Sequence, residues 1–271
     1  MNVLCPIDFS DASKSGVEYA ANLTKVLSAH LTLFYVRPSI WPEAVQLEQE
    51  AKRSAENISA QLLLFKKTVQ KEFDISCDYE MEQTTDTIEM AIAAKASKYD
   101  LIVLGTKGAD NLYQHLFGSN SFHVIEQTKC PVLIVPTGCA YQPVKRIVYA
   151  YDPKTNPIFQ IDQLLGLAAP LKTEIRVLHI LTEKRSVETE RKMEILMKSV
   201  NAREKKQVPL SFDYQYSDEV TSALDSYVSM HRGDILALSG HHRSVLEKIF
   251  GENVVKQLSR VADYPVFVFW H

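Results

Sequence analysis

Short apolar runs rich in β-branched residues alternate with longer segments of helical periodicity along the whole chain. Near-continuous apolar strands that alternate with helices are typical of a parallel sheet covered on both faces. The pattern predicts strands near residues 2–7, 31–36, 75–81, 100–105 and 131–136, and again near 145–150, 175–180, 210–216, 234–239 and 265–269. It predicts helices near 11–28, 43–73, 86–98 and 118–128, and a shorter second helix of the second half near 186–205.

The long helix expected over 43–73 has one apolar stripe and one charged face. Apolar side chains that recur every three or four residues lie on the same side of a helix, so this stripe is expected to face the sheet. The stripe consists of Ala51, Ala55, Ile58, Leu62, Phe65 and Val69.

The two halves of the chain are an internal repeat. The run that ends in Asp8 aligns with the run that ends in Asp152, 144 residues later, and the last two strands of each half align at a shift of 134. A length of 271 residues also suits two domains of roughly 150 residues each. We therefore predict two tandem α/β domains, residues 1–137 and 144–271, each an open five-stranded parallel sheet with helices on both faces. Thr137, Gly138 and Gln142 have the composition of a linker.

Composition and charge argue against nucleic acid and membranes as binding partners. The chain is 46% hydrophobic and 23% charged, with a formal net charge of −3, which is ordinary for a globular protein and offers no wide basic field for a nucleic-acid backbone. The four cysteines are far apart and form no metal-binding pair, and the first apolar run is too short for a signal peptide or a membrane span. We expect a cytoplasmic protein that binds neither nucleic acid nor membranes.

Three glycines follow the fourth predicted strand of the first half, in the pattern Gly105-x2-Gly108-x9-Gly118-Ser119. A glycine at the carboxyl end of a parallel strand lets a ligand approach the backbone, and the free N–H groups at a helix start attract anions. Ser119, Asn120 and Ser121 would add short donors there, so the pattern favours a phosphate site. The alternative is that the glycines merely end a strand and begin a helix.

This glycine pattern, together with the segment Pro6-Ile-Asp-Phe-Ser10, resembles the universal stress protein family, and the strand order of both halves resembles a tandem member. The resemblance implies an ATP site, with Mg²⁺, at the ends of the first, second and fourth strands. Carried over residue by residue, Pro6, Asp8 and Val36 would face the base and ribose, Leu104 and Gly105 would flank the sugar, and Gly108, Gly118, Ser119, Asn120 and Ser121 would hold the phosphates.

Three of these positions allow another interpretation. Asn120 replaces the small apolar residue common in the family and either donates to a phosphate or crowds the pocket. Lys107 either reaches a phosphate or is a solvated loop lysine. Asp8 either contacts the ligand or caps the helix that follows it.

The second half lacks the motif. Ser239 and His242 align with Gly105 and Gly108, and Glu252 aligns with Ser119, where a carboxylate would repel a phosphate. The pair His241 and His242 could suggest a metal site with Glu247, but adjacent histidines point in different directions and no third ligand has a recognisable spacing, so no metal site is predicted.

The favoured function is therefore a nucleotide-binding stress or signalling protein with one site per chain, in the first half. No positioned general base stands out near the glycines, so we expect no enzyme, and at most weak ATP hydrolysis with His115 or Asp110 nearby. One alternative is a scaffold for dimerisation or interaction that binds no nucleotide. A third class, an enzyme that transfers nucleotidyl groups, lacks its signature motifs.

The resemblance also implies an assembly. The two halves should pack as a pseudo-twofold pair through their fifth strands, as two single-domain members would in a dimer, and the apolar character of these strands fits such pairing. Further association into a homodimer, and an unidentified protein partner, are additional expectations.

Overall fold

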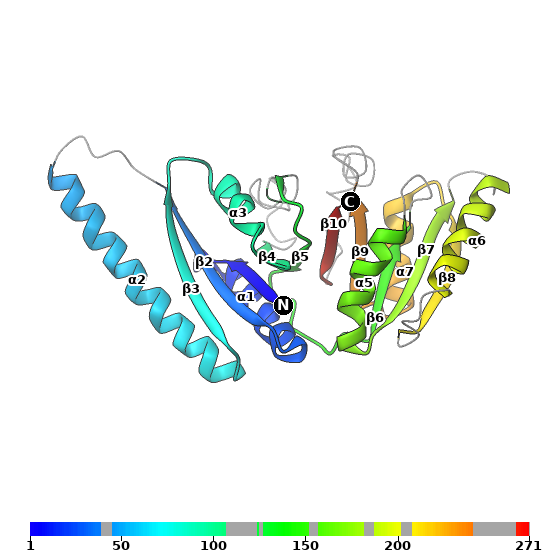
Figure 1. Cartoon of the computed structure of the whole chain (residues 1–271), viewed down its shortest axis with the longest axis horizontal. Helices are drawn as coiled ribbons and strands as arrows, with labels where there is room; N and C mark the ends of the chain where they lie inside the picture. The colour runs from blue at the N-terminus through cyan, green and yellow to red at the C-terminus, as the bar shows by residue number, and fades with distance from the viewer. Residues whose placement is uncertain are drawn as a thin grey trace.

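The computed structural model describes residues 1–38, 45–106, 124, 127–151, 157–181, 187–201, 208–240 and 264–270. Strands and helices alternate along both halves (Figure 1). The helices and strands predicted in these ranges are present, with ends that differ from the prediction by at most four residues, whereas the helix predicted near 118–128 lies almost wholly outside the described residues. The first half contains β1 (Asn2–Pro6), α1 (Asp11–Leu27), β2 (His30–Pro38), α2 (Val45–Phe73), β3 (Cys77–Thr84), α3 (Ile88–Ala96), β4 (Leu101–Thr106) and β5 (Val132–Pro136). The second contains β6 (Arg146–Ala150), α5 (Pro157–Leu171), β7 (Glu174–Leu181), α6 (Val187–Asn201), β8 (Leu210–Tyr216), α7 (Val220–Met230), β9 (Ile235–Gly240) and β10 (Val266–Trp270).

All of these strands belong to one sheet, in the order β3-β2-β1-β4-β5-β10-β9-β6-β7-β8. Within each half neighbouring strands are parallel, whereas β5 and β10 pair antiparallel, with Phe267 opposite Leu133. The expected pairing of the two fifth strands is confirmed. The expectation of two separate five-stranded sheets is wrong, because each apolar fifth strand satisfies its free backbone edge with the other.

Helices cover both faces of the sheet, and each face has its own core. Alternate residues of a strand point to opposite faces. Val3 and Cys5 of β1 therefore belong to the cluster under α1, α2, α5 and α6, while Leu4 belongs to the cluster under α3 and α7. The parallel doubly covered sheet predicted from the apolar strands is confirmed.

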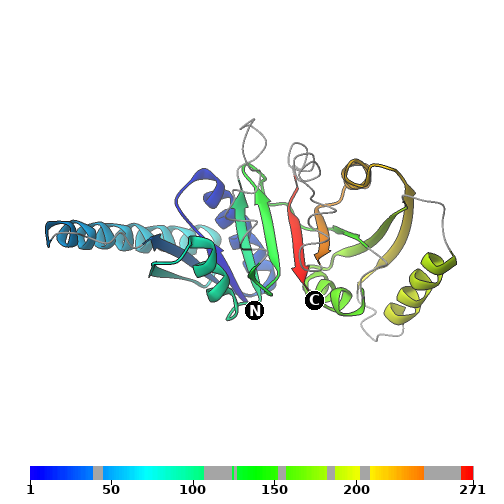
Figure 2. The same ribbon diagram turned by 90° about the horizontal axis from the view of Figure 1, so that it is seen from above.

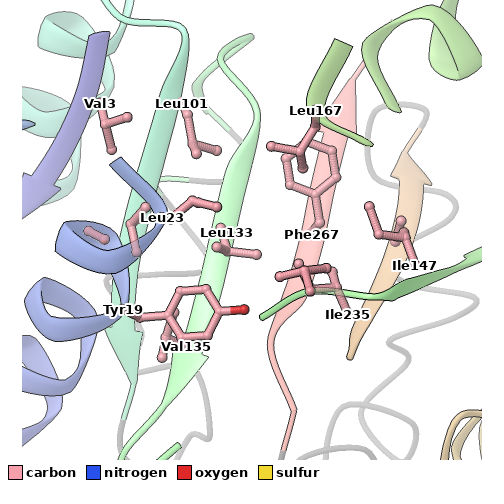
Figure 3. Close-up of a cluster of buried hydrophobic side chains, with 14 of the residues drawn as sticks. Val3, Tyr19, Leu23, Leu101, Leu133, Val135, Ile147, Leu167, Ile235 and Phe267 are labelled. Carbon is pink, nitrogen blue, oxygen red and sulfur yellow. The ribbon is translucent and has the colours of Figure 1, made fainter. Parts of the chain in front are cut away.

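The join between the halves is part of the core (Figure 3). Leu133 of β5 and Phe267 of β10 are at most 3% exposed, and Leu101 and Leu167 lie on either side of them. Burial of a side chain of this size contributes about 1.5–3 kcal/mol. The seam therefore adds hydrophobic stabilisation to the backbone pairing of β5 with β10.

Helix α2 is the longest described helix, with 29 residues, or about 43 Å at 1.5 Å per residue. It runs outward from the first-half strands, as Figure 2 shows. Leu62 and Val69 are buried and Ile58 and Phe65 pack against the same core, so the apolar stripe is confirmed from Ala55 onward. The side chain of Ala51 lies outside the described residues.

The connection between β5 and β6 contains neither helix nor strand in the structure and docks on α1. Gly138 has φ of +79°, which glycine adopts without strain, and its N–H donates to Ser15 Oγ at 3.2 Å. The Tyr141 ring packs edge-on against Tyr19, with centroids 5.1 Å apart. The domain limits 1–137 and 144–271, and the ability of each half to fold alone, stay predictions. Among the described helices, none combines the length and the apolar character needed to cross a membrane.

Candidate functional site

The order in which strands are added to the sheet switches sides between β1 and β4. Strands β2 and β3 are added on one side of β1, and β4 and β5 are added on its other side, all parallel to it. In open parallel sheets, ligands bind outside the carboxyl ends of the strands at such a switch point. The predicted residues Pro6, Asp8, Val36, Leu104 and Gly105 all lie at the carboxyl ends of β1, β2 and β4. The structure thus brings these five residues to one edge of the sheet.

Asp8 lies in the turn between β1 and α1, and its carboxylate is exposed. Its Oδ1 accepts hydrogen bonds from Ser10 N at 3.0 Å and Ser10 Oγ at 2.5 Å. Partial burial opposes ionisation, but the hydrogen bonds from Ser10 and Ser13 outweigh it and lower the pKa of Asp8 below its usual value. Asp8 is therefore a fixed carboxylate at neutral pH, with acceptor capacity left for a ligand hydroxyl.

Helix α1 is capped by Ser10 and not by Asp8. Ser10 Oγ accepts from Ser13 N at 3.2 Å, as an N-cap side chain does. The interpretation of Asp8 as the helix cap is wrong, because Ser10 is the N-cap residue of α1. The Asp8 carboxylate accepts from Ser10 instead of from the first turn of the helix. The roles of Ser10 and Ser13 as supports for Asp8 were not predicted, although a serine just before an aspartate at a helix start is an N-cap signal.

Phe9 shapes the same turn. It has φ of +64°, a left-handed conformation that is uncommon for a large residue. Its ring lies 5.9 Å from Tyr35 and 6.0 Å from Phe65, centroid to centroid, so it ties the turn to β2 and α2. This packing holds the backbone of Asp8 and Ser10 in place next to the switch point.

Gly105 lies against a helix in the structure. A Cβ added there would lie 1.8 Å from Ala12 O, and one added at Gly16 would lie 2.6 Å from Gly105 N. Helix α1 therefore approaches the end of β4 closely enough that both positions require glycine. The sequence pattern favoured a glycine at position 105 for the approach of a ligand, whereas the structure requires it there for the packing of α1 on β4. Contact of Gly105 with a sugar stays a prediction.

Val36 and Leu104 are 8% and 5% exposed and belong to the core cluster on the α3 face of the sheet. Pro6, at the end of β1, is half-buried. Because these apolar side chains are largely buried in the sheet, they would contact only the face of a base that lies directly over the strand ends. Their expected roles stay predictions.

The rest of the predicted phosphate site lies outside the described residues, and so does the second-half region with which it was compared. These residues are Lys107, Gly108, Gly118, Ser119, Asn120 and Ser121 in the first half, and Asp152, His241, His242, Glu247 and Glu252 in the second. The alternatives stated for Lys107 and Asn120 therefore stay open.

Comparison with known proteins agrees with the geometry. The universal stress protein family model matches residues 1–136, which is half of the chain. This chain belongs to the universal stress protein family.

Two curated family members match about one half of this universal stress protein. A universal stress protein of Methanocaldococcus jannaschii is 29% identical over 136 residues, 49% of this chain and 80% of the relative. One of Synechocystis is 26% identical over 147 residues, 49% of this chain and 96% of the relative.

The whole fold is also found among solved structures. A universal stress protein from Archaeoglobus fulgidus has a TM-score of 0.74 at 17% identity and covers 99% of this chain and 98% of its own. A Pseudomonas aeruginosa protein of unknown function has a TM-score of 0.59 at 14% identity, with 99% and 92% coverage. At these identities the likeness establishes the fold, and it confirms that a tandem arrangement of two such halves occurs in other chains.

Proposed function

We propose that this protein binds one adenine nucleotide, as Mg-ATP, at the switch point of its first half and acts in stress response or signalling. The observation that carries the proposal is the convergence of Pro6, Asp8, Val36, Leu104 and Gly105 at the ends of β1, β2 and β4. The family membership supports the same site. The glycine and serine pattern from Gly105 to Ser119 supplies the phosphate contacts in this proposal.

The described residues fit such a ligand. The exposed Asp8 carboxylate, held by Ser10, suits a ribose hydroxyl as donor, and the apolar Val36 and Leu104 suit the floor below a base. In the proposal, Gly118 and Ser119 open a helix whose free N–H groups attract the phosphates. Mg²⁺ bound by the phosphates would neutralise part of their charge.

We propose that the bound nucleotide changes the shape of the protein or its choice of partners, and that the protein does not hydrolyse it efficiently. Among the described residues at this edge, Asp8 is engaged by Ser10 and has no histidine beside it, so no acid–base pair is formed there. Weak hydrolysis is the most that we propose. The second half, with Glu252 at the position of Ser119, is proposed to serve as a structural or regulatory partner.

Titration calorimetry with Mg-ATP tests the proposal. We expect one nucleotide per chain, because only the first half has the uncharged Gly-Ser-Asn-Ser sequence. Gly118→Val should abolish binding by placing side-chain atoms where the phosphates approach, with an unchanged circular dichroism spectrum.

Gly251→Val, at the aligned glycine of the second half, is the matched control and should bind normally. Two equivalent sites, or binding that survives Gly118→Val and is lost in Gly251→Val, would contradict the assignment to the first half. No binding by the wild-type protein would favour the alternative, a scaffold built on the β5–β10 seam.

A further inference from the structure

A serine, a histidine and an aspartate form a hydrogen-bonded line at the opposite end of β2 and β3 from the nucleotide residues. Ser76 Oγ lies 2.7 Å from His30 Nδ1, and His30 Nε2 lies 3.3 Å from Asp78 Oδ2. Ser76 immediately precedes β3 and Asp78 is the second residue of that strand, so their side chains share one face of the strand. His30 is 46 residues from Ser76 in the sequence, and the β2–β3 register brings it beside the other two.

The proton positions in this line follow from the chemistry of its members. Lys66 of α2 donates to Asp78 Oδ1 at 2.7 Å, and this bond lowers the pKa of the Asp78 carboxyl. An ionised carboxylate can only accept, so the proton of a neutral His30 lies on Nε2, facing Asp78. Nδ1 then carries a lone pair and accepts the hydroxyl proton of Ser76. This is the arrangement in which an imidazole acts as a general base for a serine.

The line is accessible from solvent. Ser76 is exposed, and the His30 side chain is 35% exposed. The Ser76 carbonyl accepts from Leu31 N at 3.1 Å, which fixes the backbone of the serine against β2. The next residue, Cys77, is buried, and its carbonyl accepts from Gln70 Nε2 of α2 at 2.9 Å, so the backbone that follows the serine is also fixed.

We propose that Ser76 is an activated nucleophile that accepts acyl groups from small activated esters, with His30 as its base and Asp78 as the residue that positions His30. Ser76 Oγ attacks the ester carbonyl carbon while its proton moves to His30 Nδ1. The new Oγ–carbon bond forms, the bond to the leaving oxygen breaks, and the imidazolium returns the proton to that oxygen, so that the group leaves as an alcohol or phenol. Water then attacks the acyl-serine with help from the same imidazole, releases the carboxylic acid and restores the hydroxyl. This reactivity does not depend on nucleotide binding.

The experiment uses the full-length protein and p-nitrophenyl acetate, with p-nitrophenolate release followed by absorbance and acetylated peptides identified by mass spectrometry. Alkaline hydroxylamine removes acetyl groups from serine oxygen but not from lysine amines such as Lys66, and therefore separates a serine ester from acetyllysine. We expect Ser76 to be acetylated about 100-fold faster than Ser97, an exposed serine whose hydroxyl donates to a backbone carbonyl and not to an imidazole. Ser97→Ala is the matched control for Ser76→Ala.

The variants separate reactivity from simple exposure. His30→Gln should lower the acetylation rate of Ser76 about 100-fold, and added imidazole should restore part of it. Asp78→Asn keeps the shape but offers His30 an amide donor, so the imidazole proton moves to Nδ1 and the base is lost. Equal rates at Ser76 and Ser97, or a rate unchanged in His30→Gln and in Asp78→Asn, would overturn the proposal.

Discussion

The two halves of this protein have the same strand order, and their differences lie at the strand ends and in the helices. The order β3-β2-β1-β4-β5 of the first half reappears as β8-β7-β6-β9-β10 in the second. Helix α2 has 29 residues, whereas its counterpart α6 has 15. Topology is thus retained by strand pairing and core burial, while the parts that would surround a ligand differ between the halves.

The ends of the first strands differ most clearly in side-chain size. Tyr149 and Tyr151 align with Cys5 and Ile7, and all four are buried. The Tyr149 ring lies 5.9 Å from Phe269 and 6.4 Å from Tyr151, centroid to centroid. The second half fills this face of its sheet with aromatic rings where the first half has a thiol and an aliphatic chain. The two halves therefore differ in their cores as well as in the glycine motif.

The largest expected effect concerns the approach of α1 to β4, which Gly105 permits. Gly105→Ala would place a Cβ 1.8 Å from a backbone oxygen of α1, and the backbone must move to relieve it, so we expect a loss of about 3 kcal/mol in the free energy of unfolding. Ser239 aligns with Gly105 and already has a Cβ, so Ser239→Ala should change stability by less than about 1 kcal/mol.

Urea unfolding followed by circular dichroism measures both variants. If Gly105→Ala leaves the midpoint unchanged and only nucleotide binding is lost, the glycine is needed by the ligand and not by the helix. That result would restore the interpretation that the sequence alone suggested.

A second comparison, of similar or slightly smaller effect, replaces one fully buried residue in each half. Tyr149→Ala should lower the free energy of unfolding by about 3 kcal/mol, because it leaves a large cavity among the rings. Cys5→Ala removes only one sulfur atom from the aligned position and should cost about 1 kcal/mol. Equal losses would show that the aromatic filling of the second half contributes nothing beyond what the smaller first-half residue provides.

The sequence predicted the elements well, because apolar strands such as Val132–Pro136 have a strong local pattern, whereas the pairing of the halves was expected from the family resemblance. It did not predict one continuous sheet, since strand register across β5 and β10 is a tertiary property. The described candidate site residues were carried over from the family resemblance; they lie at or just after strand ends, which converge in any parallel sheet, and their contacts with a ligand stay predictions. The sequence could not reveal that Gly105 packs on α1, that Phe9 has a positive φ, or that Ser76 meets His30, because each depends on contacts between distant segments.

The smallest effect concerns the starts of two corresponding helices, α3 in the first half and α7 in the second. Thr87 caps α3 by accepting from Met90 N at 3.3 Å, while Glu219, at the start of α7, makes no side-chain cap bond. Thr87→Ala should therefore lower the free energy of unfolding by about 1 kcal/mol. Glu219→Asp keeps the charge that favours a helix N-terminus and shortens the side chain to a length that can cap, so it should raise stability by about 0.5 kcal/mol. Urea midpoints of the two variants measure both changes. A Glu219→Asp protein less stable than the wild type would show that the backbone at this residue, with φ of −108° and ψ of 85°, prevents side-chain capping. In that case the halves would differ at this helix start in backbone conformation and not only in side-chain length.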